Sequence, residues 1–415
     1  MFINPLNNSE KYEIILNLQI VNSKERVKLA FAHQEADRVP VGELYINSPV
    51  ASEILGRTAF TGWGGHVRCG IMNKMLMEGR GEEFFHQEVV DLVELYRKLE
   101  LDMIMIERPP LTNPIIPTQI DETTYRFDDP QNRLWSIIHY DKYTDSFHTT
   151  DSNFRKGGID EFKRYVDLLE QDDLNLDKWS WKQAEYIMEK CGHDMFIMAV
   201  AEIDFPPMSM GALNGVIFME AMMLQPELCE RYLDYRLSKA IRFAEKYARM
   251  GVDCIFDGED LAGSGGPLFS PEDYVKFYAP RFQKLSEVIH NNHMLYLRHT
   301  DGNIMQFADE FLLQSGFDGY QSIDPSAGMD LRLIKEKYGD KITLMGNVDC
   351  GTALQLGSKE DVIKDTLRVI KAAAPGGGHI ISSSNTIHSS IPTKNYMQML
   401  ETVRKYGEYP INPYL

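Results

Sequence analysis

Cysteine is scarce in this chain, and its few copies are widely scattered over 415 residues. An odd number of cysteines without a Cys-x-x-Cys pair argues against a disulfide framework. We therefore expect reduced thiols, each of which is most simply a buried small hydrophobic residue. The five are Cys69, Cys191, Cys229, Cys254 and Cys350.

Long hydrophobic runs are also lacking. The longest apolar stretches, such as Met195–Val200, are far shorter than the roughly 20 residues that span a bilayer. The first twelve residues lack the basic region and apolar run of a signal peptide. The sequence therefore predicts a cytoplasmic protein without a membrane partner.

Positive charge is in deficit, because 43 Lys and Arg face 61 Asp and Glu and leave a formal net charge of −18. Such a field repels phosphate backbones and polycarboxylate ligands, and the sequence contains no basic patch to offset it. We therefore expect no nucleic-acid partner. The hydrophobic fraction of 43% suffices for a sizeable core, and α/β barrels with insertions routinely occupy this length.

Short apolar runs alternate with long amphipathic segments from Asp194 onward, which is typical of βα units around a parallel sheet. Two earlier apolar runs bring the count to eight, the number of a closed barrel. The sequence thus predicts an α/β fold of the (β/α)₈ TIM-barrel type. The predicted strands are Val39–Ile46, Met103–Ile106, Met195–Ala201, Val252–Phe256, Met294–Leu297, Gly319–Ile323, Ile342–Met345 and His379–Ile381.

The helices between these strands have recognisable ends. Ser270 and Ser358 each stand where a helix N-cap is expected, with an acidic residue three positions on. Asp330 can cap another helix, and Gly251 can end a long one that starts near Pro226. Further helices are predicted over Ser23–His33 and Glu82–Leu99.

No internal repeat, low-complexity segment or linker divides the chain, so we expect a single domain over residues 1–415. Residues 1–35 would form an N-terminal helical extension. Residues 123–150 carry polar turn residues between aromatic and β-branched runs, which indicates a β-hairpin inserted into the barrel.

Catalytic groups of such barrels lie where the strands end and the loops begin. One predicted strand runs into Asp257-Gly258-Glu259-Asp260, and the next runs into Arg298-His299-Thr300-Asp301. Neighbouring parallel strands are about 4.8 Å apart, so Glu259, His299 and Asp301 could converge on one divalent ion such as zinc. The alternative is a structural histidine bonded to a carboxylate beside a solvated acidic loop.

Other strand ends supply candidates for lining a substrate pocket. Their aromatic and methionine side chains suit a flat apolar ligand, although core packing is the alternative for Phe205 and Met208. An ordinary loop histidine is the alternative for His388. The predicted substrate-binding residues are Glu43, Tyr45, Phe205, Met208, Asn385 and His388.

Five motifs resemble the uroporphyrinogen decarboxylase superfamily over nearly the whole chain. They lie at Glu25–Pro40, Gly258–Glu272, His299–Asn303, Gly346–Asp349 and Gly377–Pro392. The resemblance implies a TIM barrel. It also implies either a cofactor-free porphyrinogen decarboxylase or a zinc-dependent methyltransferase that works with a corrinoid-carrying protein.

Each branch of the superfamily has features that this chain lacks. Family decarboxylases bind porphyrin carboxylates through an arginine-rich N-terminal segment, and the matching stretch Arg38–Tyr45 has an acid where arginine would be needed. The decarboxylases also place a histidine where this chain has Asn385. Thiol-methylating members hold zinc through His-x-Cys and a further Cys, and here the three positions are His299, Asp301 and Asn385.

A zinc ion held by imidazole and oxygen donors is a harder Lewis acid than one held by thiolates, which suits an oxygen leaving group. The resemblance therefore indicates the methyltransferase component of a corrinoid-dependent O-demethylase in an anaerobe. It would take methyl groups from small methoxylated aromatic compounds. Catalysis and metal binding are assigned to Glu259, His299 and Asp301, with Asp257 or Asp260 orienting the histidine.

Two alternatives stay open at this stage. One keeps the fold but makes the chain a metal-free decarboxylase of the uroporphyrinogen decarboxylase type. The other is a non-catalytic protein that still binds a corrinoid partner. The sequence also leaves room for a homodimer, and it does not decide whether Asp301 or Asn385 touches a metal directly.

Overall fold

The barrel strands form one parallel sheet in the order β1-β6-β7-β10-β11-β12-β13. The computed structural model describes residues 21–62, 65–203 and 215–414. The predicted α/β fold class is confirmed, since seven apolar runs coincide with the strands of this sheet. They are β1 (Met103–Ile106), β6 (Phe196–Val200), β7 (Cys254–Gly258), β10 (Leu295–Thr300), β11 (Gly319–Ser322), β12 (Thr343–Met345) and β13 (His379–Ile380).

The eighth position of the ring is taken by an irregular segment rather than by the regular strand predicted over Val39–Ile46. Within it, Val41 forms a parallel bridge to Ile381, and the Ile381 amide donates to the Pro40 carbonyl at 2.9 Å. On the other side, the Asp102 amide donates to the Val41 carbonyl at 2.8 Å, just before β1. A continuous ladder fails because Pro40 has no N–H to donate.

Helices cover the outside of the sheet, and the predicted helix ends are confirmed. Ser270 and Ser358 accept bonds from backbone amides three residues on, and Asp330 caps its helix in the same manner. Gly251 ends α9 with a φ of 84°, a left-handed conformation that suits glycine. The helices of eight or more residues are α2 (Ser23–Phe31), α3 (Ser48–Leu55), α5 (Gly81–Lys98), α6 (Asn153–Leu169), α7 (Lys182–Cys191), α8 (Gly215–Leu224), α9 (Pro226–Met250), α11 (Ala279–Asn291), α13 (Leu331–Tyr338), α14 (Lys359–Ala373) and α15 (Thr393–Tyr406).

Shorter elements complete the described chain. The short α-helices are α4 (Ile71–Met77), α10 (Pro271–Asp273) and α12 (Ala308–Gln314). Single turns of 3₁₀ or π geometry are η1 (Gly65–Gly70), η2 (Leu176–Lys178), η3 (Tyr274–Tyr278), η4 (Pro325–Ala327) and η5 (Cys350–Leu356). A two-stranded ribbon pairs β8 (Ala262–Gly263) with β9 (Gly266–Pro267). None of the described helices is long and apolar enough to cross a membrane.

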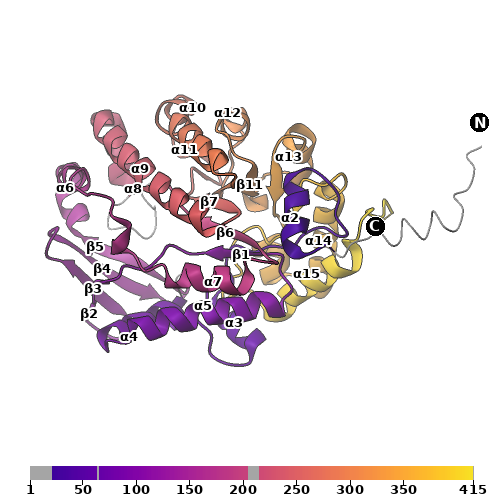
Figure 1. The fold of residues 1–415 in the computed structure, drawn as a ribbon, viewed down its shortest axis with the longest axis horizontal. Helices are drawn as coiled ribbons and strands as arrows, with labels where there is room; N and C mark the ends of the chain where they lie inside the picture. The colour runs from indigo at the N-terminus through magenta and orange to yellow at the C-terminus, as the bar shows by residue number, and fades with distance from the viewer. Residues whose placement is uncertain (1–20, 63–64, 204–214, 415) are drawn as a thin grey trace, which may run out of the picture.

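The insertion is larger than the hairpin predicted over residues 123–150. It is a four-stranded antiparallel sheet of β2 (Thr118–Gln119), β3 (Thr124–Asp129), β4 (Leu134–Asp141) and β5 (Ser146–Ser152). Tyr125 and Phe147 pack with Cys69 in a small core of their own. Figure 1 shows this sheet at the left end of the molecule, away from α2, α14 and α15.

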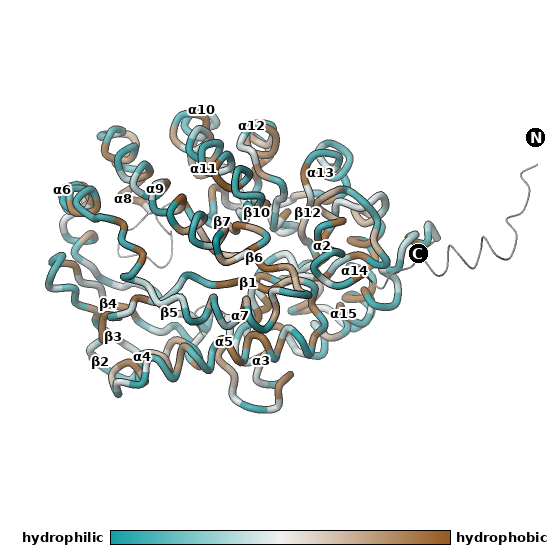
Figure 2. The backbone as a smooth tube through the Cα atoms, viewed as in Figure 1, coloured by the Kyte–Doolittle hydropathy of each residue, from teal (hydrophilic) through white to brown (hydrophobic). Residues whose placement is uncertain are grey.

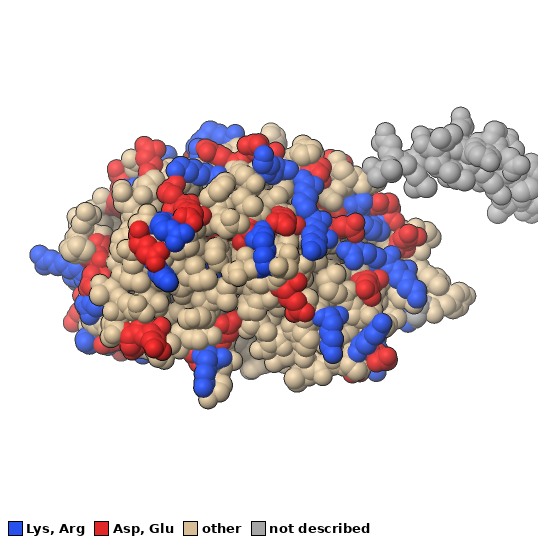
Figure 3. Space-filling model, turned by 90° about the horizontal axis from the view of Figure 1, so that it is seen from below, with Lys and Arg blue, Asp and Glu red and all other residues tan. Residues whose placement is uncertain are grey.

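Side chains of the barrel strands alternate between two hydrophobic cores. Met103 and Met105 belong to the inner core together with residues of the other strands, whereas Ile104 and Ile106 belong to the outer core under the helices. Figure 2 shows mixed colours along the covering helices, as expected for amphipathic segments. Acidic and basic side chains are interspersed on the face drawn in Figure 3. All five cysteines are buried and none forms a disulfide, as predicted.

Asp102 ties the N-terminal helix and the closing segment to the start of β1. Its carboxylate is fully buried and accepts bonds from Arg26 at 2.6 Å, from Arg38 at 2.7 and 2.9 Å, and from Ser23 at 2.8 Å. It also accepts the Val41 amide at 2.8 Å. One carboxylate therefore joins three parts of the chain that are distant in sequence.

Replacement of Asp102 is expected to weaken the whole fold. The change Asp102→Asn should lower the free energy of unfolding by about 3 kcal/mol or more, because two partly or fully buried guanidinium groups lose a charged partner. Urea denaturation would measure the effect. The control Arg332→Ala removes an exposed ion pair with Glu336 and should cost less than about 0.5 kcal/mol. An unchanged unfolding midpoint for Asp102→Asn would contradict this assignment.

Candidate metal centre

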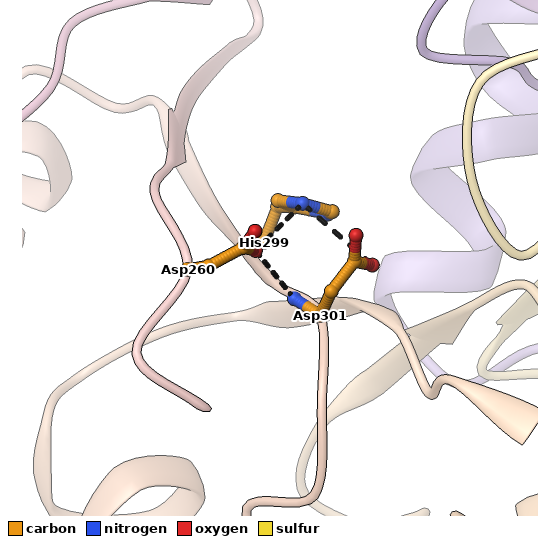
Figure 4. A group of neighbouring side chains, drawn as sticks. All are labelled: Asp260, His299 and Asp301. Atoms are coloured by element: carbon orange, nitrogen blue, oxygen red, sulfur yellow. Dashed lines mark hydrogen bonds and ion pairs between the residues drawn. The ribbon is translucent and has the colours of Figure 1, made fainter. Parts of the chain in front are cut away.

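Three ligand-type side chains meet at the carboxyl ends of two adjacent strands. The parallel register pairs His299 of β10 with Gly258 at the end of β7, and Asp260 follows two residues later. One ligand atom each of Asp260, His299 and Asp301 lies within 4.8 Å of the others (Figure 4). The His299 Nε2 atom is 3.6 Å from Asp260 Oδ1 and 3.9 Å from Asp301 Oδ1.

Backbone hydrogen bonds hold the two strand ends together. The Asp301 amide donates to Asp260 Oδ1 at 2.8 Å, and the Leu261 amide donates to Thr300 Oγ1 at 2.8 Å. Thr300 itself is fully buried. The two carboxylates thus face the histidine from loops that are bonded to each other.

Two amide side chains contact the cluster from further strands. The Oε1 atom of Gln321 on β11 bonds to His299 Nδ1, and because an amide oxygen only accepts, the proton lies on Nδ1. The Nδ2 group of Asn385 donates to Asp301 Oδ2. The other oxygen, Asp301 Oδ1, is buried without a hydrogen-bond partner. A buried carboxylate oxygen without a partner beside an imidazole nitrogen is a group that a cation would satisfy.

The charges within the cluster are strongly coupled. Burial lowers the pKa of His299, but Asp301, Asp260 and Gln321 outweigh it and raise that pKa to about 9. Burial raises the pKa of Asp301, whereas contact with His299 brings the pKa of Asp260 below its usual value despite burial. Without a metal ion, an imidazolium therefore balances the carboxylates, and a divalent cation would replace that proton.

Glu259, predicted as a metal ligand, does not join this cluster. Its Oε1 atom lies 3.6 Å from an Arg108 guanidinium that also pairs with Glu202. Arg298 donates to the backbone carbonyls of Asp257 and Glu259 at 2.7 Å each. These bonds fix the turn after β7. In this turn the Asp260 side chain lies beside His299, and the Glu259 side chain lies beside Arg108. Of the three residues predicted as ligands, His299 and Asp301 lie in the cluster, Glu259 does not, and Asp260 is its third member.

Asp257 serves the scaffold rather than the histidine. It is fully buried, accepts a hydrogen bond from Tyr296 at 2.8 Å and lies 3.4 Å from Arg298. Of the two aspartates predicted to orient His299, only Asp260 lies near the ring, and it does so at Nε2. The residue that bonds to Nδ1 is Gln321, which the sequence reasoning missed.

The register of the sheet carries the signal that would have found Gln321. His299 of β10 is the direct partner of Gln321 on β11, so the two side chains leave the same face of neighbouring strands. Gln321 is the one long polar side chain in the run Gly319–Ser322, and it is only 1% exposed. A buried polar residue beside a candidate ligand indicates a hydrogen-bond partner.

The described residues that were predicted to bind substrate do not line one common pocket. Asn385 reaches the cluster, whereas Glu43 is buried in the barrel wall. Tyr45 lines a separate cavity between the barrel and the helices α5 and α7. His388 is partly buried in the loop after β13, and burial lowers its pKa. The predictions for Phe205 and Met208 lie outside the described residues.

The buried carboxyl group of Glu43 makes the free energy of unfolding depend on pH. Its carboxyl group accepts bonds from the amide and hydroxyl of Ser383 at 3.1 and 2.5 Å, but burial outweighs them and raises its pKa from 4.5 to about 8. The native state therefore holds a proton that the unfolded chain releases, so this contribution is complete below pH 4.5 and is lost as the pH rises through 8.

The isosteric change Glu43→Gln removes this titration. Relative to the unmodified chain, the variant should gain stability as the pH rises from 5 to 9, by at most about 1.4 kcal/mol per pH unit. Urea denaturation of both proteins at pH 5, 7 and 9 would measure the gain. A stability difference that does not vary with pH would refute the assigned pKa.

Comparisons with known proteins agree with the motifs. Residues 211–406 match the family described as uroporphyrinogen decarboxylase (URO-D). The uroporphyrinogen decarboxylases of Crocosphaera subtropica and Synechocystis are 26% and 24% identical over 200 and 189 residues. These matches cover 47% and 44% of this chain and 52% and 50% of those proteins. The chain thus spans about half the length of the curated relatives it matches.

The fold extends the likeness beyond that region. A methyltransferase from Methanosarcina mazei superimposes with a TM-score of 0.60 over 93% of this chain and 99% of that protein, at 17% identity. At this identity the likeness concerns the fold alone. Residues 211–406 therefore match the family that the motifs of the sequence indicated.

Proposed function

We propose that the chain is the methyltransferase component of a corrinoid-dependent O-demethylase acting on methoxylated aromatic compounds. The observation that carries the proposal is the cluster of Asp260, His299 and Asp301, which offers one imidazole and two carboxylates and no thiolate. The fold, which a methyltransferase shares, is compatible with this reaction class. The substrate and the corrinoid partner are inferred from this donor chemistry.

The residues of the cluster fit a zinc ion. Zinc sites in enzymes commonly use three His, Asp or Glu ligands and keep one position open for substrate. His299, Asp260 and Asp301 would hold the ion, and the buried, unpartnered Asp301 Oδ1 is an oxygen that such an ion would satisfy. When bound, the ion would supply Lewis acidity toward the oxygen of an aryl methyl ether.

The chain's own residues then have supporting roles. Asp260 and Asp301 lower the local potential, and the bonded loops after β7 and β10 keep both carboxylates turned toward His299. The partly buried position of His299 limits the access of water to the cluster. These residues bind and orient, and none of them forms a bond to the methyl group.

The nucleophile is accordingly assigned to a reduced corrinoid on a partner protein. Thiols are the strongest alternative nucleophiles of a methyltransferase, and burial raises the pKa of Cys350, the one beside the Asn385 loop, to about 12. Burial likewise raises the pKa of Cys229 to about 12. Both stay protonated at neutral pH and are poor nucleophiles. Methyl transfer would break the carbon–oxygen bond, leave its electron pair on the phenolate and form a carbon–cobalt bond.

A metal-free decarboxylase is the second candidate function, and the uroporphyrinogen decarboxylase relatives favour it. The position of Glu43 argues against it. This acid stands in the stretch where the decarboxylases have arginine, and it lies buried in the barrel wall. A substrate with many carboxylates would therefore meet no cation at this position.

The test combines metal analysis with methyl transfer. The purified protein should contain about one zinc ion per chain. It should also demethylate methoxybenzoates with cob(I)alamin as the methyl acceptor, and the reaction is measured as the loss of cob(I)alamin absorbance. His299→Ala should lose the metal and lower the rate by more than about 100-fold, since loss of a residue behind a ligand alone costs roughly 10–100-fold.

A matched control is available on the outer surface. His290 of α11 is also paired with a carboxylate, that of Asp318 at 2.8 Å, but it lies away from the cluster. His290→Ala should keep both metal and activity. Normal demethylation by His299→Ala would sink the proposal, metal-free turnover of a porphyrinogen would favour the decarboxylase, and the absence of both metal and turnover would favour a non-catalytic protein.

A further inference from the structure

We infer that Gln321 and Asn385 are positioning residues that decide which atoms of His299 and Asp301 face a bound ion. The inference rests on the proposed function for the identity of that ion. Each amide bonds to one atom of a proposed ligand and leaves another atom of the same ligand facing the cluster. Neither amide belongs to the group of three proposed ligands.

Gln321 acts on the histidine ring. Its amide oxygen occupies the Nδ1–H group, so the lone pair of the neutral ring lies on Nε2, the nitrogen that faces Asp260 and Asp301. The contact is rigid because the two residues are register partners on adjacent strands and Gln321 is 1% exposed. A neutral amide fixes the ring in this way without adding a third negative charge.

Asn385 acts on the carboxylate from beyond β13, the last strand in the sheet order. It follows β13, 84 residues from Asp301 in sequence, and its Nδ2 group bonds to Asp301 Oδ2. Only Oδ1 is then left without a hydrogen-bond partner, so Asp301 would offer one oxygen rather than two. In thiol-methylating relatives the position of Asn385 carries a zinc ligand. In this chain Asn385 instead orients Asp301, which is one of the proposed ligands.

The Asn385 amide is itself held from two sides. Its Oδ1 atom accepts the Thr386 amide at 2.5 Å, and its backbone carbonyl oxygen lies 2.5 Å from the Ser383 Oγ atom. Ser383 in turn bonds to the buried Glu43. A continuous chain of contacts therefore runs from the barrel wall to Asp301, which a freely rotating substrate-binding amide would not need.

The experiment measures zinc affinity of the full-length apoprotein by competition with a chromophoric chelator. Gln321→Met keeps the shape but removes the acceptor, so zinc should bind about 10–100-fold more weakly. Gln321→Glu keeps an acceptor and adds a negative charge, so it should bind zinc at least as tightly as the unmodified protein. Asn385→Leu should weaken zinc binding by about 10-fold or more. In each variant the ring tautomer of His299, observed by ¹⁵N NMR above pH 10, gives a second measurement that needs no metal.

Thr343→Val is the matched control for changes in a buried barrel strand. Thr343 lies at the amino end of β12, where its hydroxyl bonds to the Ala30 carbonyl at 3.3 Å, far along the strand direction from the cluster. The Thr343→Val variant should keep the zinc affinity and the His299 tautomer of the unmodified protein. A loss of affinity in Thr343→Val equal to that in Gln321→Met would show a general effect of strand damage and overturn the inference.

Zinc affinity and methyl transfer, measured side by side, distinguish a failure of the positioning role from a failure of the proposed function. Unchanged zinc affinity and tautomer in Gln321→Met would overturn the role of Gln321, even if the protein demethylates aromatic ethers. Weakened zinc binding in Gln321→Met without any methyl transfer by the unmodified protein would support the positioning role and reject the proposed reaction. An unmodified protein that binds no zinc would reject both.

Discussion

The buried carboxylate of Asp102 is the constraint on which the closed barrel depends. The described residues give this sheet no regular eighth strand, so the ring is completed by an irregular segment whose backbone makes few ladder bonds. Asp102 compensates by bonding to that segment at Val41 and to Arg26 and Arg38 around it. Because a buried carboxylate must find donors, the charge specifies where the N-terminal helix and the closing segment lie.

The closed ring in turn makes the cluster possible. The ends of β7 and β10 supply the cluster, while β11 and the loop after β13 supply the two amides that contact it. The curvature of the sheet brings the loop after β13 to Asp301, although β13 lies three places from β10 in the strand order. Arg298 and the bond between Asp301 and Asp260 then fix the loops at their ends. The site is therefore built mainly on strand ends, and its geometry follows from the register rather than from one flexible loop.

The sequence predicted more of the fold than of the site. Seven strands and the capped helices follow from local patterns, because alternation and capping residues act over a few positions. His299 and Asp301 were recognised from their place beyond a strand. The sequence does not show which of the adjacent acids Glu259 and Asp260 faces His299. That depends on the turn after β7, which Arg298 holds by donating to the Glu259 carbonyl. Gln321 and the role of Asn385 depend on contacts between distant strands, which a single sequence does not display.

The absence of sulfur from the cluster has a consequence for oxidative damage. Zinc sites built on thiolates lose their ligands when oxidants convert cysteine to sulfenic acid or a disulfide. Imidazole and carboxylate groups do not undergo these reactions, and the five cysteines of this chain are buried thiols away from solvent. Exposure to air would therefore leave the imidazole and carboxylate groups of this cluster unchanged.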